Sequence, residues 1–323
     1  MDLNSYVEKY NQDFYLNTEK KNCLCGSSKE KKLFDLDRYL LKNRVVTCKN
    51  CGLIFTNPML KKSFLQDFYQ SDIYRKLYNH QLNENIDNIF LNEGDGSINA
   101  FNFLEKFVSH KKKELNIIEI GSGNNSNLVH FKSVGNLYAI DYSEESKKLS
   151  AKQEIIFEQG GVEVLKKLNI KFDIIILSHV IEHFHDFRND MLEIRKFSNE
   201  NSLFYIEVPS MDLKYNLDQL QNAHNFYFTK NSFLYHLNKL GLNSLEYGVA
   251  SKIHQYGIFK NGKISPYSQN VDEYKRIVKI HRNFCYNFYF VYLLNLYLRK
   301  FIKKLVGKNM TNFIKSSLKK IRK

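Results

Sequence analysis

Residues 116–125 read Asn-Ile-Ile-Glu-Ile-Gly-Ser-Gly-Asn-Asn, a short apolar run followed by a turn with glycine at positions 121 and 123. A β-branched run bounded by glycines predicts a buried strand that ends in a tight turn. Four similar runs follow, at residues 136–140, 154–157, 172–177 and 202–208. Helix-length amphipathic stretches such as 143–151, with Ser143 as the expected N-cap, and 188–198 lie between them. This alternation predicts an α/β protein with a doubly wound parallel sheet.

The composition is that of a folded protein of about two domains. The chain has 323 residues, of which 43% are hydrophobic and 25% charged, with five cysteines. Five cysteines are too few for a secreted disulfide scaffold of this length. No uncharged apolar run reaches 18 residues, and the first ten residues hold no apolar leader segment. We therefore expect a cytoplasmic protein.

The positive charge is confined to one end of the chain. The net charge is +14, and residues 260–323 hold 16 basic and two acidic residues, so the whole excess lies there. The remaining residues are neutral in sum, which argues against a nucleic-acid partner for the body of the protein. By pattern we divide the chain into residues 1–60, a cysteine module; 61–112, a helical linker or lid; 113–260, the α/β domain; and 261–323, a basic helical tail.

Three features fall at predicted strand ends, where doubly wound sheets bind their ligands. Gly121 and Gly123 allow a ligand to approach the backbone closely. Asp141 ends the second strand 20 residues after Gly121, where an acid can accept hydrogen bonds from ribose hydroxyls. A dinucleotide site offers a similar pattern, but Asn125 stands where its third glycine would be. Glu119, inside the strand, suits a cationic ligand better than a pyrophosphate.

The ordered set of motifs resembles the class I S-adenosylmethionine-dependent methyltransferases. The matching segments are IIEIGSGNN, YAIDYS, FDIIILSHVIEHFHD, LFYIEVPS and FTKNSFLYHLNKLGL. The resemblance implies a Rossmann-like fold and S-adenosylmethionine as cofactor, with the ribose on Asp141. The family often has an Asp for the adenine after the third strand, and this chain has none in Phe157-Glu-Gln-Gly-Gly161. The cofactor-binding residues that we predict are Glu119, Gly121, Ser122, Gly123, Asp141, Tyr142, Ser178 and His179.

A histidine-rich segment, Ser178 to Asp186, follows the fourth predicted strand. Methyl transfer to a hydroxyl needs a base for the hydroxyl proton, and histidine is the usual one. We predict that His183 is this base and that Glu182 orients it; in sugar-modifying members of the family a Glu-His pair faces the acceptor. Two alternatives stay open. If the segment is helical, His179, Glu182 and His183 share a face and could bind a metal with His224. Alternatively, Glu182 and His183 cap the following helix or bond backbone groups.

Four cysteines form two pairs near the N-terminus, Cys23 with Cys25 and Cys48 with Cys51, and a glycine follows each pair. Tetrahedral zinc sites use such pairs, although the first pair is one residue shorter than usual. The segment resembles the zinc-binding segment that precedes the methyltransferase domain in some bacterial sugar- and polysaccharide-modifying enzymes. We therefore predict structural zinc; unpaired buried thiols or a redox pair are the alternatives. Cys285, alone in the tail, is expected to be inert.

In the tail, apolar residues alternate with lysine and arginine at helical spacing: Phe284, Phe288, Tyr292, Asn295 and Arg299. A basic amphipathic helix can lie on an anionic membrane surface, or can pack on the body or on a second subunit. Together these features predict a methyltransferase that O-methylates a sugar, either nucleotide-linked or in a surface glycan under assembly. The alternatives are methylation of RNA or of another small molecule, and a non-catalytic scaffold with the same fold.

Overall fold

The computed structural model describes residues 3–70, 100–108, 115–286, 294 and 297–298. Residues 1–276 form one compact unit and residues 277–323 form a second. The strands are β1 (Thr18–Glu19), β2 (Glu30–Leu36), β3 (Lys42–Cys48), β4 (Ile54–Thr56), β5 (Met59–Leu60), β6 (Leu115–Ile120), β7 (Gly135–Asp141), β8 (Ile156–Gln159), β9 (Phe172–Ser178), β10 (Ser198–Pro209), β11 (Phe226–Tyr227), β12 (Leu242–Val249) and β13 (His254–Asn261). The α-helices are α1 (Leu3–Asp13), α2 (Lys62–Gln70), α5 (Ala100–Leu104), α6 (Glu144–Lys152), α7 (Leu165–Leu168), α8 (Phe187–Lys196), α9 (Lys230–Lys239) and α10 (Val271–Phe284).

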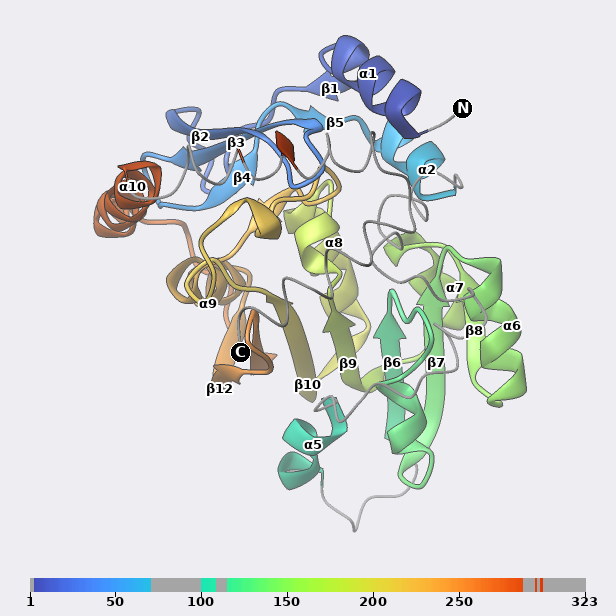
Figure 1. The fold of residues 1–323 in the computed structure, drawn as a ribbon. Coiled ribbons are helices and arrows are strands. Elements are labelled where there is room, and N and C mark those ends of the chain that lie inside the picture. The colour runs from blue at the N-terminus through green and yellow to red at the C-terminus, as the bar shows by residue number, and fades with distance from the viewer. Residues whose placement is uncertain (1–2, 71–99, 109–114, 287–293, 295–296, 299–323) are drawn as a thin grey trace, which may run out of the picture. The chain divides into compact units, whose positions relative to one another are not determined.

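A seven-stranded sheet with the order β12-β13-β10-β9-β6-β7-β8 forms the centre of the first unit (Figure 1). The five strands that the sequence predicts are β6 to β10, and each neighbouring pair among them is parallel. The chain runs outward from β6 through β7 to β8, and then crosses to β9 and β10 on the other side. This reversal beside β6 is the switch point of a doubly wound sheet. The predicted α/β, Rossmann-like fold class is confirmed.

Both faces of this sheet are buried, which explains why its strands are apolar at consecutive positions. One face, with Ile118, Ile175 and Phe204, packs against apolar residues of α8, α9 and the cysteine module. The opposite face, with Ile117 and Ile174, packs against α5 and the turn at residues 128–131. Ser143 caps α6 by accepting a hydrogen bond from the Ser146 amide, as predicted. Thr229 and Ser232 form a reciprocal capping box at the start of α9.

The sheet differs from the prediction at one edge, because it is mixed rather than wholly parallel. β13 pairs antiparallel with β10, and β12 pairs antiparallel with β13. β12 is mostly exposed or half-buried and contains a glycine, so it lacks the apolar run that identified the other strands. The two strands place His254 beside Pro209, at the carboxyl end of β10.

The cysteine module has its own sheet, with the order β11-β4-β3-β2. β11 comes from residues 226–227, far along the chain, and pairs with β4 through Phe226 and Phe55. Helices α1 and α2 share an apolar cluster beside this sheet, which includes Tyr10 and Phe68. Of the predicted helical segment 61–112, α2 and α5 are described, whereas residues 71–99 and 109–112 lie outside the described residues.

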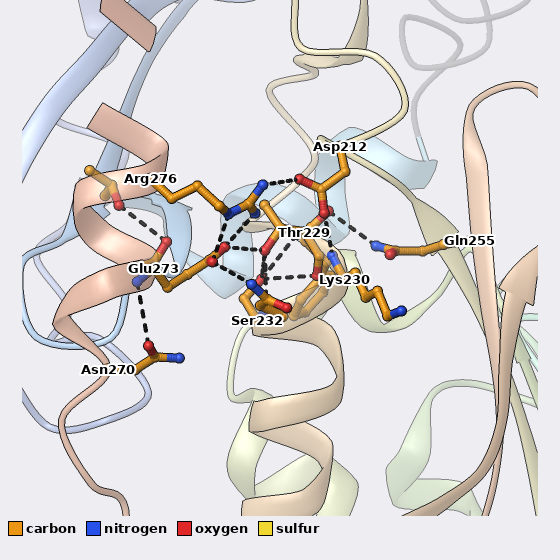
Figure 2. Close-up of polar contacts among 12 residues, drawn as sticks. Asp212, Thr229, Lys230, Ser232, Gln255, Asn270, Glu273 and Arg276 are labelled. Carbon is orange, nitrogen blue, oxygen red and sulfur yellow. Dashed lines mark hydrogen bonds and ion pairs between the residues drawn. The ribbon is translucent and has the colours of Figure 1, made fainter. Parts of the chain in front are cut away.

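The start of α10 is held by a buried carboxylate, Glu273, shown in Figure 2. Its two oxygens accept hydrogen bonds from Thr229 Oγ1 and Asn231 Nδ2, each at 2.7 Å. Arg276 pairs with the same carboxylate and with Asp212, both at 2.7 Å. These contacts join residues 273–276 to the first turn of α9.

Most of the predicted tail helix, including Phe288, Tyr292, Asn295 and Arg299, lies outside the described residues. Among the helices that the structure describes, none combines the length and apolar character needed to cross a membrane.

Candidate active site at the carboxyl edge of the sheet

The glycine turn after β6 and the end of β7 are joined by one carboxylate. Asp141 accepts hydrogen bonds from the Gly123 amide at 3.0 Å and from the Ser143 amide at 2.8 Å. Gly121 and Gly123 have φ values of +69° and +51°, in the left-handed region that favours glycine. A Cβ on Gly121 would lie 2.6 Å from Val180 Cγ2, whereas a Cβ on Gly123 would meet no atom within 4 Å. The backbone at Gly123 is therefore open to a ligand.

Two polar side chains of this region are buried with unsatisfied atoms. Glu119 is 2% exposed; its Oε1 accepts a hydrogen bond from Asn127 Nδ2 at 2.6 Å, and its Oε2 has no hydrogen-bond partner. Burial raises the pKa of Glu119 to about 8. Ser122 Oγ is also buried without a partner. Such groups are uncommon in proteins, and they fit a site that a polar ligand completes.

The structure places the other predicted cofactor residues at the same edge. Tyr142 follows β7. Its hydroxyl packs so closely on Gly161 that a Cβ at residue 161 would lie only 2.2 Å from it. Ser178 ends β9 and lies opposite Glu207 of β10 in the parallel ladder. His179 follows with φ at +57°, a strained conformation for a histidine. The structure thus brings the glycine turn, Asp141 and residues 178–179 to the ends of the adjacent strands β6, β7 and β9.

His179 lies between two carboxylates and beside a second imidazole. Its Nδ1 is 3.5 Å from Glu182 Oε1, and its Nε2 is 3.6 Å from Glu207 Oε1. His254 Nδ1 is 3.5 Å from the same Glu207 oxygen. Burial would lower the pKa of His179, but the carboxylates of Glu182 and Glu207 raise it to about 10.

His183 belongs to a different cluster of side chains, in which its ring packs against that of His224. Its Nδ1 is 3.0 Å from the Ala223 carbonyl oxygen, and the His183 and His224 rings are 4.6 Å apart. A carbonyl only accepts, so Nδ1 carries the proton and Nε2 is the acceptor nitrogen. Burial lowers the pKa of His183, which keeps the ring neutral near pH 7.

The helical face on which the metal alternative depends does not form. Residues 181–183 make a single 3₁₀ turn after the left-handed His179, so the helical spacing that would align His179 with His183 is lost. Ligand atoms of Glu182, His183 and His224 lie within 4.8 Å of one another, whereas His179 groups with Glu207 and His254. The cap of α8 is Asp186, which accepts from the Asn189 amide, and not Glu182 or His183.

Sequence reasoning missed Glu207 and His254. Glu207 lies inside the quoted segment LFYIEVPS, and a charged residue in a buried strand was the available signal, as it was for Glu119. His254 begins β13, a strand that the pattern did not predict, so nothing in the sequence placed it beside β10.

The four cysteines of the N-terminal module converge. Their sulfur atoms all lie within 4.8 Å of one another, with Cys23 and Cys51 3.5 Å apart and Cys25 and Cys48 3.6 Å apart. A disulfide would need about 2.05 Å, and all four are free thiols. Four sulfurs at about 2.3 Å from one zinc are roughly 3.8 Å apart in a tetrahedron, so the spacing and the donor set fit that ion.

Groups around the cysteines also suit thiolate ligands. The Asn50 amide and side chain donate hydrogen bonds to Cys48 Sγ at 3.4 Å and Cys25 Sγ at 3.5 Å. Gly52 has φ at +77°, and its amide bonds the Cys48 carbonyl in a tight turn. His236 of α9, which sequence reasoning missed, is fully buried with its Nε2 3.7 Å from Cys51 Sγ.

A doubly wound sheet with this switch-point edge defines a nucleoside-binding α/β protein. A family model described as a methyltransferase domain matches residues 79–247, just over half of the chain. The chain therefore belongs to the methyltransferase-domain family, and it is an S-adenosylmethionine-dependent methyltransferase. No curated protein matches it.

Several solved methyltransferase structures are similar to this chain at low identity. The 1,6-didemethyltoxoflavin-N1-methyltransferase of Burkholderia thailandensis, solved with S-adenosylhomocysteine, is 13% identical, with a TM-score of 0.48 over 65% of this chain and 96% of that one. The plantazolicin methyltransferase BpumL is 16% identical, with a TM-score of 0.45 over 61% and 93%. Magnesium protoporphyrin IX methyltransferase of Synechocystis PCC 6803 is 12% identical, with a TM-score of 0.45 over 62% and 100%.

Proposed function

We propose that this methyltransferase binds S-adenosylmethionine at the turn after β6 and transfers its methyl group to a sugar hydroxyl. The observation that carries the binding site is the Asp141 carboxylate, which holds the Gly123 amide while the backbone there stays open. The turn, formed by Gly121, Ser122 and Gly123, would lie against the methionine part of the cofactor. Bound there, the cofactor supplies an electrophilic methyl group on a sulfonium.

In this proposal each polar group of the edge has a part in binding. A carboxylate accepts about four hydrogen bonds, so Asp141 can bond the ribose hydroxyls besides its two backbone amides. Glu119, with a buried oxygen that lacks a partner, suits the cationic end of the ligand. Tyr142, Ser178 and His179 border the same strand ends and complete the binding surface.

His183 is the proposed general base. Its proton lies on Nδ1, bonded to the Ala223 carbonyl, so Nε2 can accept the proton of the acceptor hydroxyl as the carbon–oxygen bond forms. The lowered pKa keeps the ring in its neutral form at pH 7. Glu182, buried next to His183 in the chain, would orient the ring and stabilise the positive charge that it gains.

The sugar acceptor, either nucleotide-linked or in a glycan under assembly, is proposed from the resemblance of the cysteine module to that of sugar-modifying enzymes. In the same proposal, Cys23, Cys25, Cys48 and Cys51 bind one structural zinc. The enzyme would work in the cytoplasm, with its basic tail in contact with the inner membrane surface.

The test is methyl transfer by the full-length protein to a panel of nucleotide sugars, with RNA and unrelated small molecules beside them. We expect a sugar product heavier by one methyl group, with an O-methyl resonance in its NMR spectrum. Methylation of RNA or of a nitrogen atom instead would contradict the sugar assignment. Binding of S-adenosylhomocysteine without turnover on any acceptor would favour the scaffold alternative.

A further inference from the structure

Three residues from three separate strand ends converge at the sheet edge outside the glycine turn: His179 after β9, Glu207 in β10 and His254 at the start of β13. Each offers a ligand atom, and the three atoms lie within 4.8 Å of one another. Two imidazoles and one carboxylate form a donor set that divalent first-row transition metals accept. Antiparallel pairing of β13 with β10 brings His254 to this place.

The spacing is that of ligands around an ion rather than of direct hydrogen bonds. Glu207 Oε1 lies 3.6 Å from His179 Nε2 and 3.5 Å from His254 Nδ1. Both separations exceed the 2.7–3.2 Å of ordinary hydrogen bonds. Two ligands at about 2.1 Å from one ion are roughly 3.4 Å apart at the tetrahedral angle. A single ion can therefore bridge the oxygen and both nitrogens with little movement.

The ligand residues have the supporting contacts that metal sites use. A metal-bound histidine commonly donates its other ring N–H to a carboxylate. His179 Nδ1 faces Glu182 Oε1 at 3.5 Å, and this carboxylate is 1% exposed with no hydrogen bond to either oxygen. The other oxygen of Glu207 accepts a hydrogen bond from the Tyr205 hydroxyl at 2.7 Å. The Tyr205 hydroxyl thus orients Glu207, and Glu182 is placed to accept the Nδ1–H of His179 once an ion binds its Nε2.

The site is also strained and open. His179 keeps a left-handed backbone at φ +57°, which is costly for a residue with a Cβ, and strain of this kind concentrates at functional sites. The His179 amide donates to the Glu207 carbonyl at 2.9 Å, which holds the two residues in register. The His179 side chain is 39% exposed, so one side of the proposed ion faces solvent. Catalytic metal sites leave such a position for water or substrate.

We propose that His179, Glu207 and His254 bind a divalent first-row transition ion, separate from the four-cysteine site, with an open position for an acceptor oxygen. Binding of the ion stands on the geometry alone, and its contact with the acceptor rests on the proposed function. Under this proposal His179 belongs to the acceptor side of the site rather than to the cofactor side.

The test is titration with Mn²⁺ of the full-length protein that holds no more than one zinc per chain, monitored by electron paramagnetic resonance, because excess zinc would occupy a site of imidazole and carboxylate ligands ahead of Mn²⁺. Mn²⁺ prefers oxygen and nitrogen ligands over thiolates, so the cysteine site does not compete for it. We expect one saturable site, with affinity at least about tenfold weaker in His254→Ala and in Glu207→Gln. Glu182→Gln, which removes the carboxylate beside His179 but none of the three ligands, should weaken binding by about 10- to 100-fold. His130→Ala, at an exposed histidine of the turn at residues 128–131, is the matched control and should bind as the unaltered protein does.

The outcomes separate the two proposals because the titration uses neither cofactor nor acceptor. Absence of saturable Mn²⁺ binding in a folded protein would overturn the metal site and leave methyl transfer untouched. Binding that survives His254→Ala but is lost in His224→Asn would place the ion at the Glu182–His183–His224 cluster and would also overturn this assignment. Thermal unfolding of each variant, compared with the unaltered protein, identifies any loss that comes from misfolding.

Discussion

The Asp141 carboxylate accepts a hydrogen bond from the Gly123 amide at 3.0 Å. This contact joins the end of β7 to the turn after β6. The sequence predicted that the first of these places binds the ribose and that the second lets the ligand approach the backbone closely. The carboxylate thus shapes the turn before any ligand arrives, and the same oxygen atoms retain lone pairs for hydroxyls.

Asp141→Ala should weaken cofactor binding by about 1–3 kcal/mol, because ribose hydroxyls would be left without an acceptor. Asp141→Asn keeps one carbonyl oxygen for the Gly123 amide and should lose less. Calorimetry with S-adenosylhomocysteine measures both. Equal affinity in Asp141→Ala and the unaltered protein would remove Asp141 from the site.

Cofactor affinity should depend on pH through Glu119. Its folded pKa, raised by burial to about 8, keeps the carboxyl protonated at neutral pH. If the ionised form binds a cationic ligand, binding must release this proton, so affinity should rise up to about tenfold per pH unit toward pH 8 and then level off. Without ligand the sign is opposite, because a raised carboxyl pKa removes stability as pH rises from about 4.5 to about 8.

The measurement is calorimetry in buffers of different ionisation enthalpy, which counts the protons released on binding. Glu119→Gln should abolish both the proton release and the pH dependence of affinity. If the unaltered protein shows constant affinity and no proton release from about pH 6 to about pH 8, Glu119 does not meet the charge of the ligand.

The purified protein should carry about one zinc per chain on Cys23, Cys25, Cys48 and Cys51. Thiolate sites contribute folding free energy directly, so chelation should lower the melting temperature. Cys48→Ser should lose the metal, whereas Cys285→Ser, at the exposed cysteine of the second unit, should retain it. Elemental analysis that finds no metal in freshly purified, reduced protein would reject the zinc site.

The fold was largely predictable because the five parallel strands are buried on both faces and therefore carry continuous apolar runs. β6 and β9, for example, begin and end within one residue of the predicted ranges. β12 and β11 could not be predicted, because β12 is largely exposed and β11 is two residues whose pairing with β4 is set by the folded chain. The mixed edge of the central sheet follows from the antiparallel pairing of β13 with β10 and of β12 with β13.

The same reasoning explains which part of the site was found. Glu119 and Asp141 stand at the ends of recognisable strands, so strand order alone places them together. Glu207 and His254 meet through an antiparallel pairing across 47 residues of chain that no local pattern signals. The single turn at His183 departs from the helical spacing because His179 takes a left-handed backbone, which sequence does not reveal for a histidine.

The basic tail should bind anionic lipid vesicles. Each lysine or arginine near such a surface adds about 1 kcal/mol, and the effect weakens with salt. The full chain should sediment with phosphatidylserine vesicles at low salt, and a chain ending at residue 286 should not. Sedimentation of both forms alike, or of neither, would contradict membrane contact through the tail.

The last prediction concerns His183. If its Nε2 accepts the hydroxyl proton, His183→Ala should lower turnover by roughly 10²- to 10⁴-fold while affinity for S-adenosylhomocysteine stays nearly unchanged, because the base contacts the acceptor. The acidic limb of the pH–rate profile should lie below the ordinary histidine range, since burial lowers the pKa of His183. Glu182→Gln should have a milder effect, and His130→Ala should have none.

If His183 has only a structural role, through its bond to the Ala223 carbonyl, the alanine variant should instead lose about 1 kcal/mol of stability and keep its turnover once folded. Turnover of a folded His183→Ala enzyme on its sugar acceptor decides between these outcomes, and activity close to that of the unaltered enzyme would exclude His183 as the base.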